Sequence, residues 1–465
     1  MGLTRLVVVS NRVTPLSGRK AASAGGLAVG LLSALQETGG IWFGWSGELH
    51  RHPALEPKLF RSGRITYALM DLAEEEFDGY YAGLANRTLW PLFHYRLDLA
   101  VYDHEWYAVY RRVNQRFAEA LFPLLREGDL VWVHDYHLIP IATELRRLGA
   151  KVRLGFFLHI PFPSPEVYLT LPWHRQLVVD LCAYDLVGFQ TPTDLRQFRE
   201  YIELELGGRS DGKGRVRVLG RRLRAVAVPI GIEPEDVTAM AVSPDARRQA
   251  QRVAATLSGR HLVVGVDRLD YTKGIPERLR AFELLLRDYP AHRQRVTFMQ
   301  ISAPSREDVP EYMELRRSVE LLSGHINGVY SEADWVPLRY INRGFTRRAL
   351  MGFFRLGRIG LVTPLRDGMN LVALEYVAAQ DPENPGVLVL SRFAGCAAHL
   401  DGALIVNPYD IHQVADSLHT GLTMSLEERT ERWQRMMTAV REHDVRRWKQ
   451  RFLEWLREAD PGRRS

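Results

Sequence analysis

The sequence contains very little cysteine and very little lysine. Only Cys182 and Cys396 occur among 465 residues, both inside apolar stretches, which argues against a disulfide framework and for a reducing cytoplasm. Lysine accounts for six of the 61 basic residues, which leaves 55 arginines. These are spread along the whole chain, so we expect no nucleic-acid partner despite the net charge of +6.

Long apolar runs are also missing. None approaches the length needed to cross a bilayer, so we expect no membrane partner. The first ten residues read as a β-strand and lack the charged, long apolar and cleavage regions of a signal peptide. A length of 465 residues, with 46% hydrophobic and 25% charged content, suits a cytoplasmic enzyme of two or more domains.

The first half of the chain alternates strand-like and helix-like segments. Apolar runs predict strands at Leu6–Ser10, Leu130–His134, Arg153–His159, Asp185–Phe189 and Arg224–Val228. Helical patterns lie between them, notably at Glu105–Leu125 and Asp194–Leu206. Residues 207–224 are rich in glycine and charge, as suits an exposed hairpin or loop.

The second half repeats the alternation. We expect strands at His261–Val266, Arg295–Ile301, Ile359–Val362, Gly386–Leu390 and Ala403–Val406. This order predicts an α/β fold with two Rossmann-like, doubly wound parallel-sheet domains facing across a cleft, residues 1–230 and 231–442. Two prolines and a glycine make Pro229–Pro234 the expected hinge. A last helix, Val445–Glu458 within about residues 443–460, could pack on either domain.

Residues 363–375, T-P-L-R-D-G-M-N-L-V-A-L-E, carry the strongest functional signal. They follow a buried strand, turn at residues 366–368 and open an apolar helix at about Asn370. The first amides of a helix lack partners within it and the helix dipole is positive there, so a phosphate or diphosphate fits. Asp367 before the helix and Glu375 within it can accept hydrogen bonds from sugar hydroxyls. The pattern suggests a nucleotide-sugar site.

Polar residues also follow strands of the first half. Arg12 lies just beyond the first strand, at the end where ligands of open α/β sheets bind. Gly25 and Gly26 in A-S-A-G-G-L-A-V-G permit close approach of a ligand, although glycine there is more often turn chemistry. Asp135 in H-D-Y-H and His159 follow two further strands, which suggests a shared role. The H-x-x-H spacing has no third zinc ligand, so we expect no metal.

Two loops of the second half carry cations. Arg268 and Lys273 lie in R-L-D-Y-T-K-G, which lacks the G-x-x-x-x-G-K pattern of a P-loop. Two cations beside a helix start nevertheless match a diphosphate. Arg306 in A-P-S-R-E-D follows the next strand and could bind another phosphate. Each arginine by itself would be explained by a surface ion pair.

Ordered motifs from Leu6 to about Trp455 closely resemble those of the trehalose-6-phosphate synthase family. The matching segments are S-N-R, A-S-A-G-G-L-A-V-G, W-F-G-W-S-G, Y-Y-A-G-L-A-N-R-T-L-W-P-L-F-H-Y, H-D-Y-H-L, F-L-H-I-P-F-P-S-P-E, P-I-G-I-E-P, R-L-D-Y-T-K-G, A-P-S-R-E-D-V and T-P-L-R-D-G-M-N-L-V-A. The resemblance implies a GT-B fold and a retaining glucosyltransferase that moves glucose from UDP-glucose to glucose 6-phosphate without a cofactor. It also implies a homo-oligomer, expected to be a tetramer.

The resemblance assigns the acceptor site residue by residue. Arg12, Tyr81 and Arg306 would bind the 6-phosphate. Trp90 and Asp135 would shape the place of the acceptor sugar.

The donor site is assigned in the same way. Arg268 and Lys273 would hold the diphosphate, Glu375 would bind the ribose diol, and Phe345 would lie near the uracil. The full donor set is Gly25, Gly26, His159, Arg268, Lys273, Phe345, Asp367, Gly368, Met369, Asn370, Leu371, Val372, Ala373, Leu374 and Glu375. The residues expected to serve catalysis are His159 and Asp367, through hydrogen bonds to the transferred glucose, with Arg268 and Lys273.

The implied mechanism is a same-face reaction without a covalent enzyme intermediate. A leaving phosphate oxygen would take the acceptor hydroxyl proton, and His159 would orient rather than titrate. No carboxylate in the motifs suits a double displacement, which needs a second carboxyl group about 5 Å away. Arg268 and Lys273 would neutralise the leaving diphosphate, so no metal is required.

Two residues depart from the family pattern, and several alternatives stay open. Leu374 replaces a usual Lys, and Asp267 replaces a usual Glu. A related synthase could use glycerol 3-phosphate or a cyclitol phosphate, and a catalytically silent sugar-phosphate sensor would share the motifs. A nicotinamide oxidoreductase is improbable because no G-x-G-x-x-G follows the first strand. The donor base could be uracil, guanine or adenine.

Overall fold

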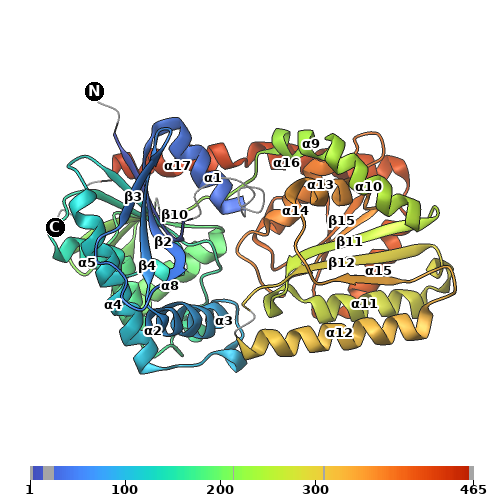
Figure 1. The fold of residues 1–465 in the computed structure, drawn as a ribbon, viewed down its shortest axis with the longest axis horizontal. Coiled ribbons are helices and arrows are strands. Elements are labelled where there is room, and N and C mark those ends of the chain that lie inside the picture. Colours follow the sequence, from blue (N-terminus) through green and yellow to red (C-terminus); the bar gives the residue numbers. More distant parts are fainter. Residues whose placement is uncertain (1–3, 14–25, 213, 307–308, 460–465) are drawn as a thin grey trace. The chain divides into compact units, whose positions relative to one another are not determined.

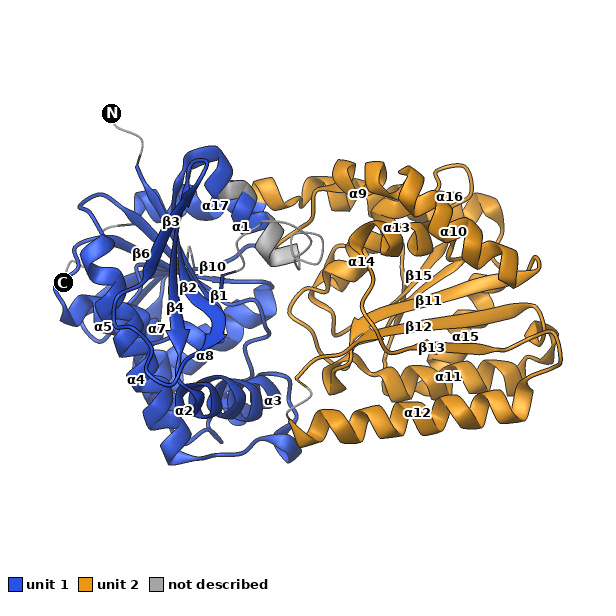
Figure 2. Ribbon diagram, viewed as in Figure 1, with its two compact units in different colours: residues 1–229, 448–465 blue, residues 230–447 orange. Residues whose placement is uncertain are grey.

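The computed structural model describes residues 4–13, 26–212, 214–306 and 309–459 (Figure 1). The chain forms two compact units (Figure 2). Unit 1 comprises Met1–Pro229 with Trp448–Ser465, and unit 2 comprises Ile230–Arg447. Each unit is built on one sheet of mainly parallel strands, which confirms the predicted α/β class. The chain leaves unit 1 inside the segment predicted as a hinge, and hinge motion stays a prediction.

The sheet of unit 1 has ten strands in the order β3-β4-β2-β1-β5-β6-β7-β10-β9-β8. The seven central strands, β4-β2-β1-β5-β6-β7-β10, run parallel to one another. At the edges, β3 pairs antiparallel with β4, β9 with β10, and β8 with β9. The strands are β1 Leu6–Arg12, β2 Gly40–Leu49, β3 Lys58–Ser62, β4 Ile65–Leu72, β5 Leu130–His134, β6 Arg153–Phe157, β7 Leu186–Phe189, β8 Arg209–Ser210, β9 Arg215–Val218 and β10 Arg221–Ala227. The predicted hairpin at residues 207–224 is the ribbon β8–β10.

The helices of unit 1 fill the connections between these strands. They are α1 Gly26–Thr38, α2 Glu74–Glu76, η2 Phe77–Leu89, α3 Trp90–Phe93, η3 Leu97–Leu99, α4 His104–Leu121, η4 Phe122–Leu124, η5 Tyr136–Leu138, α5 Ile141–Arg147, α6 Pro165–Tyr168, α7 His174–Leu181, α8 Pro192–Leu206 and α17 Val445–Glu458. Helix α4 ends earlier than predicted, at Leu121, where the chain passes into the 3-10 turn η4 and Pro123 has no amide hydrogen with which to continue the α-helical hydrogen bonds.

One helical element of unit 1 was not predicted. Residues 77–89 form the π-helix η2, which leads into α3. A Cβ added at Gly79 or Gly83 would lie less than 3 Å from Val109 or Trp106 of α4. Glycine at these two positions therefore lets η2 and α4 pack closely, and this packing fixes the helix that carries Tyr81.

Helix α17, which the sequence leaves free to pack on either domain, lies against β5–β7 of unit 1. Trp448 and Phe452 pack their rings 4.8 and 4.7 Å from Trp132 of β5. A Cβ at Gly155 or Gly188 would approach the Phe452 ring to 2.9 or 2.8 Å, so these glycines open the groove for the helix. Helix α17 therefore packs next to the end of β6, where Trp448 contacts the candidate residue His159.

Unit 2 has a six-stranded parallel sheet in the order β13-β12-β11-β14-β15-β16. The strands are β11 His261–Arg268, β12 Val296–Ala303, β13 Leu338–Ile341, β14 Ile359–Val362, β15 Val387–Ser391 and β16 Leu404–Val406. The helices are α9 Pro234–Ala241, α10 Pro244–Leu257, η6 Tyr271–Lys273, α11 Ile275–Asp288, η7 Pro290–His292, α12 Pro310–Tyr330, α13 Arg347–Leu356, α14 Leu371–Ala379, η8 Gly395–Ala398, α15 Ile411–Thr423 and α16 Leu426–Glu442.

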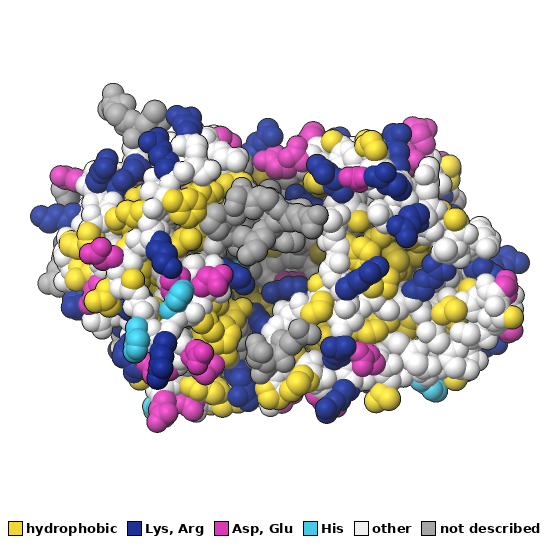
Figure 3. Space-filling model, viewed as in Figure 1, with side chains coloured by type: hydrophobic (Ala, Val, Ile, Leu, Met, Phe, Trp, Pro, Cys, Tyr) yellow, Lys and Arg dark blue, Asp and Glu magenta, His cyan; other side chains and the backbone are white. Residues whose placement is uncertain are grey.

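Helices cover both faces of this sheet, with α11, α12 and α15 on one side and α9, α10, α13, α14 and α16 on the other (Figure 1). Strands covered on both faces are expected to be continuously apolar, and β14 is buried at every position. No helix among the described residues is both long enough and apolar enough to span a bilayer. On the face in Figure 3 the Lys and Arg side chains are scattered rather than gathered in one patch.

Candidate active site

The strongest sequence motif forms a strand–turn–helix at one end of the unit 2 sheet. Strand β14 ends at Val362 and α14 begins at Leu371, with Asn370 as its N-cap, as predicted. The Asn370 side chain accepts a hydrogen bond from the Ala373 amide at 3.2 Å and donates one to Asp367 at 3.0 Å. Asn370 thus satisfies one of the first amides of α14 and also fixes the Asp367 carboxylate.

The lysine loop lies directly against this turn. Arg268 ends β11, residues 271–273 form a short 3-10 turn, and Gly274 at φ +63° leads into α11. A Cβ at Gly274 would lie 2.5 Å from the carbonyl oxygen of Thr363, so only glycine lets the two loops approach this closely. The Leu365 amide also donates to the Thr272 carbonyl at 2.8 Å.

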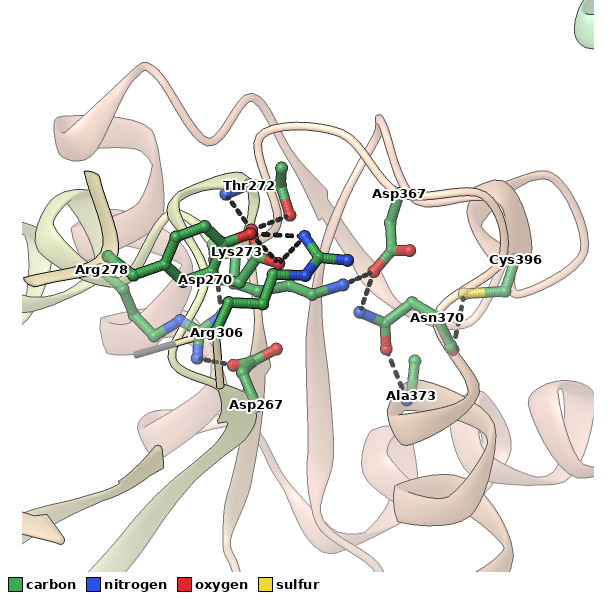
Figure 4. A network of polar contacts seen from close by, with 11 residues as sticks. Asp267, Asp270, Thr272, Lys273, Arg278, Arg306, Asp367, Asn370, Ala373 and Cys396 are labelled. Atoms are coloured by element: carbon green, nitrogen blue, oxygen red, sulfur yellow. Dashed lines mark hydrogen bonds and ion pairs between the residues drawn. The ribbon is translucent and has the colours of Figure 1, made fainter. Parts of the chain in front are cut away.

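Lys273 and Asp367 bind each other. The Lys273 ammonium lies 2.5 Å from an Asp367 carboxylate oxygen, and the two side chains are only 11% and 16% exposed (Figure 4). The resemblance assigns these residues to the diphosphate and to the glucose, and the structure brings them into one ion pair. A ligand that binds here would therefore meet a cation and an anion already placed side by side.

A buried carboxylate that the sequence analysis did not single out, Asp270, lies among the cations. Its side chain accepts hydrogen bonds from the amide and hydroxyl of Thr272 at 3.0 and 2.9 Å. Burial by itself would raise the Asp270 pKa, but the charges of Arg306, Arg268 and Lys273 outweigh it and lower the pKa to about 2. Asp270 is therefore ionised and balances three candidate phosphate-binding residues.

A second buried residue, Arg278 on α11, joins the two loops. Its guanidinium donates to the Lys273 carbonyl at 3.1 Å and to the Thr363 hydroxyl at 3.0 Å. It also pairs with Asp267 at 2.6 Å (Figure 4) and donates to Gln300 at 2.9 Å. Asp267, a departure from the family pattern, is thus a buried counter-ion. Its pKa is raised by burial, an effect that Arg278 opposes.

The remaining donor candidates lie along α14 and the segment before α13. Glu375 accepts a hydrogen bond from Nε of Arg347 at 3.0 Å, and Nη2 of Arg347 lies 2.9 Å from the same carboxylate oxygen. Burial raises the Glu375 pKa, and Arg347 opposes the rise. Phe345 lies two residues before Arg347 and packs on Phe353. Of the other donor candidates, Gly368, Met369, Ala373 and Leu374 are buried, and Leu371 and Val372 are partly exposed. Gly26 begins α1, and Gly25 lies outside the described residues.

In unit 1 two acceptor candidates, Arg12 and Tyr81, contact the same aromatic ring, that of Trp45. Arg12, exposed at the end of β1, lies with its guanidinium carbon 5.6 Å from the centre of the Trp45 ring. Trp45 in turn contacts Tyr81, and Tyr81 stacks on His137. Trp90 is buried to 5% exposure, so it can shape a sugar site only from behind its neighbours.

Asp135 and His159 are brought together at the ends of the parallel neighbours β5 and β6. The Asp135 carboxylate accepts a hydrogen bond from the His159 amide at 3.1 Å. His159 follows β6 by two residues because the strand ends at Phe157, earlier than predicted. The His159 ring contacts His134, which lies in the H-D-Y-H motif but was not assigned a role, with ring nitrogens 3.0 Å apart.

Both histidines are held in the neutral form. Burial lowers the His159 pKa to about 3, and burial together with His159 lowers the His134 pKa well below its usual value. Trp448 from α17 closes over the pair, with ring centres 5.9 and 6.2 Å away. His159 is therefore unsuited to donate a proton as a general acid at neutral pH, and its ring nitrogens contact His134 and, at 3.4 Å, Gln190.

Three of the candidate residues also have an unusual backbone conformation. Asp135, Arg306 and Asn370 adopt positive φ angles of 74°, 50° and 70°. Such angles are uncommon for residues other than glycine and occur where the surrounding structure enforces them, often at ligand sites. Groups of three or more His, Cys, Asp or Glu side chains that could hold a metal do not occur in the described part of the chain.

Comparison with known proteins identifies the family of the chain. The glycosyltransferase family 20 model matches residues 4–458. Trehalose-6-phosphate synthase from Sinorhizobium fredii is 50% identical over 97% of this chain and 98% of its own length. That from Cronobacter sakazakii is 47% identical over 99% and 96%.

Solved structures are equally similar. A UDP-forming alpha,alpha-trehalose-phosphate synthase from Burkholderia vietnamiensis matches with a TM-score of 0.96 and 49% identity, covering 98% of this chain and 97% of that one. A Burkholderia xenovorans synthase in complex with glucose-6-phosphate gives 0.93 and 51%, covering 97% and 99%. An E. coli structure bound with UDP-2-fluoro glucose gives 0.95 and 46%, covering 99% and 100%. With its motifs, its two parallel sheets and this full-length similarity, the chain belongs to glycosyltransferase family 20.

Proposed function

We propose that this protein transfers glucose from UDP-glucose to glucose 6-phosphate and releases UDP and α,α-trehalose 6-phosphate. The observation that best supports this proposal is a cluster of cations in unit 2. The charges of Arg268, Arg306 and Lys273 all act on the buried Asp270 carboxylate. Relatives that are 47–50% identical over almost their whole length are named trehalose-6-phosphate synthases. One similar structure contains glucose-6-phosphate and another UDP-2-fluoro glucose, which supports both substrate assignments.

The donor diphosphate would bind beside the lysine loop. As the bond from glucose C1 to the phosphate oxygen breaks, negative charge grows on the diphosphate. Lys273 and Arg268 stabilise that charge, and because Lys273 is already positioned by Asp367 it needs little reorganisation. Asp367, which shares its carboxylate between Lys273 and Asn370, can accept a hydrogen bond from a glucose hydroxyl.

The proton of the acceptor would pass to the leaving group rather than to a side chain. The acceptor hydroxyl oxygen bonds to C1 on the face that the phosphate oxygen leaves, and that phosphate oxygen takes the hydroxyl proton. His159, with a pKa of about 3, stays neutral and holds the glucose by a hydrogen bond. In this mechanism Asp367 serves as a hydrogen-bond acceptor and not as a nucleophile, and one of its carboxylate oxygens binds both Lys273 and Asn370.

Following the family resemblance, Arg12, Tyr81 and Arg306 would bind the 6-phosphate of the acceptor. Asp135 binds the sugar hydroxyls, and Trp90 supports that surface from within the core. Glu375 would bind the ribose and Phe345 would border the base. On this assignment unit 1 mainly serves the acceptor and unit 2 mainly serves the donor.

The cellular setting is inferred from the cysteines and the distribution of charge. We expect a homo-oligomer in the cytoplasm, without nucleic acid or membrane as a partner. The two cysteines are buried thiols, and the basic side chains visible in Figure 3 form no continuous patch.

A product assay tests the proposal. Purified protein is incubated with UDP-, GDP- or ADP-glucose and with glucose 6-phosphate or glycerol 3-phosphate, and NMR defines the linkage of the product. We expect UDP release with glucose 6-phosphate and an α,α-1,1 linkage. Turnover only with glycerol 3-phosphate would establish a different synthase, and no release of any nucleotide would support a sugar-phosphate sensor.

A further inference from the structure

Arg306 is held in place by a tyrosine outside the motifs that the family resemblance covers. Its guanidinium nitrogen Nη1 donates to the hydroxyl of Tyr312 at 2.5 Å, and the Arg306 side chain is only 7% exposed. The Tyr312 hydroxyl in turn donates to the Asp270 carboxylate at 3.2 Å. The guanidinium and that carboxylate, both labelled in Figure 4, are themselves 3.8 Å apart, so the three side chains form a closed triangle.

The direction of each hydrogen bond in this triangle is fixed by protonation. Burial, reinforced by the Asp270 charge, raises the Tyr312 pKa far above its usual value, so the phenol keeps its proton. Asp270, with a pKa of about 2, is ionised and can only accept. Tyr312 must therefore donate to Asp270 and accept from Arg306.

Backbone and ring contacts also connect the segment around Arg306 with the lysine loop. Arg306 has a φ of +50°, and its carbonyl accepts from the Val309 amide at 3.0 Å. Tyr312 lies in the first turn of α12, and its ring packs at 5.2 Å from Tyr271 of the lysine loop. The tyrosine therefore links the Arg306 loop, through one hydroxyl and one ring, to the loop that carries Lys273.

We propose that Tyr312 is a positioning residue that acts through Arg306, fixing the guanidinium for the phosphate of the acceptor, with Asp270 as the anchor of both. The inference rests on the proposed acceptor role of Arg306. A guanidinium loses rotational freedom when it binds phosphate, and a side chain already fixed in one orientation loses less of it. The same Asp270 carboxylate balances Arg268 and Lys273, so the acceptor and donor cations share one counter-ion.

The test is the conservative variant Tyr312→Phe, combined with Arg306→Ala in a double-mutant cycle. The phenylalanine keeps the ring packing and removes only the oxygen between Arg306 and Asp270. Since a hydrogen bond to a charged group is worth more than an ordinary one, we expect a KM for glucose 6-phosphate roughly tenfold higher. The KM for UDP-glucose and kcat should change by less than about twofold.

Two comparisons make the result specific. Tyr340→Phe removes another buried phenol oxygen in unit 2, one without a hydrogen-bond partner in the described part of the chain, and should leave both KM values unchanged. In an Arg306→Ala background, Tyr312→Phe should have no further effect on the KM for glucose 6-phosphate, because its partner is gone. Calorimetry of each variant confirms that it is folded.

The possible outcomes separate the two proposals. If Arg306→Ala raises the KM for glucose 6-phosphate and Tyr312→Phe does not, the positioning role is wrong and the acceptor role stands. If Arg306→Ala leaves that KM unchanged, the acceptor role of Arg306 is wrong and this inference falls with it. A Tyr312→Phe effect that persists in the Arg306→Ala background, or that alters both substrates equally, would show a general structural role instead.

Discussion

In unit 1 the candidate residues lie among aromatic rings, whereas in unit 2 they lie among compensated charges. His159 and His134 contact each other and Trp448, and burial keeps both rings neutral. Lys273 and Asp367, by contrast, lie 2.5 Å apart as a largely buried ion pair. These two pairs thus meet the cost of burying polar groups in different ways, the histidines by neutrality and the lysine and aspartate by charge compensation.

This difference matches the chemistry proposed for each unit. Neutral hydrogen-bonding groups can orient sugar hydroxyls at little electrostatic cost, which suits the surroundings of His159. Compensated cations can exchange part of their pairing for a phosphate, which suits the loops around Asp270. If this comparison is right, variants of unit 2 should affect charge stabilisation most, and variants of unit 1 should mainly change the response to pH.

The largest effect is expected from Arg278→Ala. Removing this guanidinium leaves Asp267 buried without its partner and releases the carbonyl of Lys273 from the loop beside it. Loss of one partner of a buried ion pair costs about 3–5 kcal/mol of stability. Calorimetry should therefore show a much lower unfolding temperature.

Arg280→Ala is the matched control on the same helix. The Arg280 side chain is 46% exposed and lies 3.8 Å from Glu277, a surface pair worth less than about 1 kcal/mol. Equal stability of the two variants would mean that the buried pair does not hold the loops together.

The next effect is on the rate. Lys273→Ala removes the ammonium group expected to stabilise the departing diphosphate, so kcat/KM should fall by roughly 10²–10³. Lys58→Ala removes a lysine that also pairs with an aspartate, Asp71, at 2.7 Å, but in unit 1, and should leave turnover unchanged. Steady-state assays with both substrates decide between them. Near-normal kcat/KM in both Lys273→Ala and Arg268→Ala would remove the diphosphate assignment.

The elements that carry the candidate site could be predicted, because local sequence specifies them. An apolar run followed by a turn and an apolar helix placed Asn370 at a helix start, and the structure has it as the N-cap of α14. The ends of β5 and β6 lie side by side, as expected for neighbouring strands of a parallel sheet that end in polar residues. The pattern could not reveal the π-helix at residues 77–89, whose geometry depends on packing against α4.

The residues that position the site could not be predicted, because their partners lie far away in the sequence. Arg278 lies on the apolar face of α11, three residues after Ile275. A charged residue on an apolar face is unusual, and this was the sequence feature that could have indicated a buried ion pair. Its ties to Thr363 and Gln300 depend on the order of β11, β12 and β14 in the sheet, which no local pattern contains. Asp270 lies inside the R-L-D-Y-T-K-G motif, but its role as a counter-ion depends on contacts with Arg306 and Tyr312, which lie more than 30 residues later in the chain.

A smaller effect, on pH dependence, is expected from the histidine pair of unit 1. A buried neutral histidine takes up no proton in the folded state until far below its usual pKa of about 6.5, whereas the unfolded chain does. Stability is therefore lost as the pH falls through 6.5, by about 2 kcal/mol per such histidine between pH 7 and pH 5.

The variant His134→Asn isolates this contribution. Asparagine can replace the ring nitrogen that contacts His159, and it does not titrate. Between pH 7 and pH 5 it should lose about 2 kcal/mol less stability than the unaltered protein, as measured by denaturant unfolding. His52→Asn, at an exposed position, should leave the pH dependence unchanged, and identical pH profiles for His134→Asn and the parent would contradict a neutral buried pair.

The smallest effect is expected from metal removal, and it tests whether the cations of unit 2 are sufficient. Negative charge on the departing diphosphate is proposed to be stabilised by Lys273 and Arg268, with α14 adding the positive end of its dipole. Activity with UDP-glucose and glucose 6-phosphate should therefore be the same before and after dialysis against EDTA. Loss of activity that added Mg²⁺ or Mn²⁺ restores would show that the charge compensation around Asp270 is incomplete without a divalent ion. The contrast between the neutral histidine pair of unit 1 and the compensated cations around Asp270 in unit 2 would then need revision.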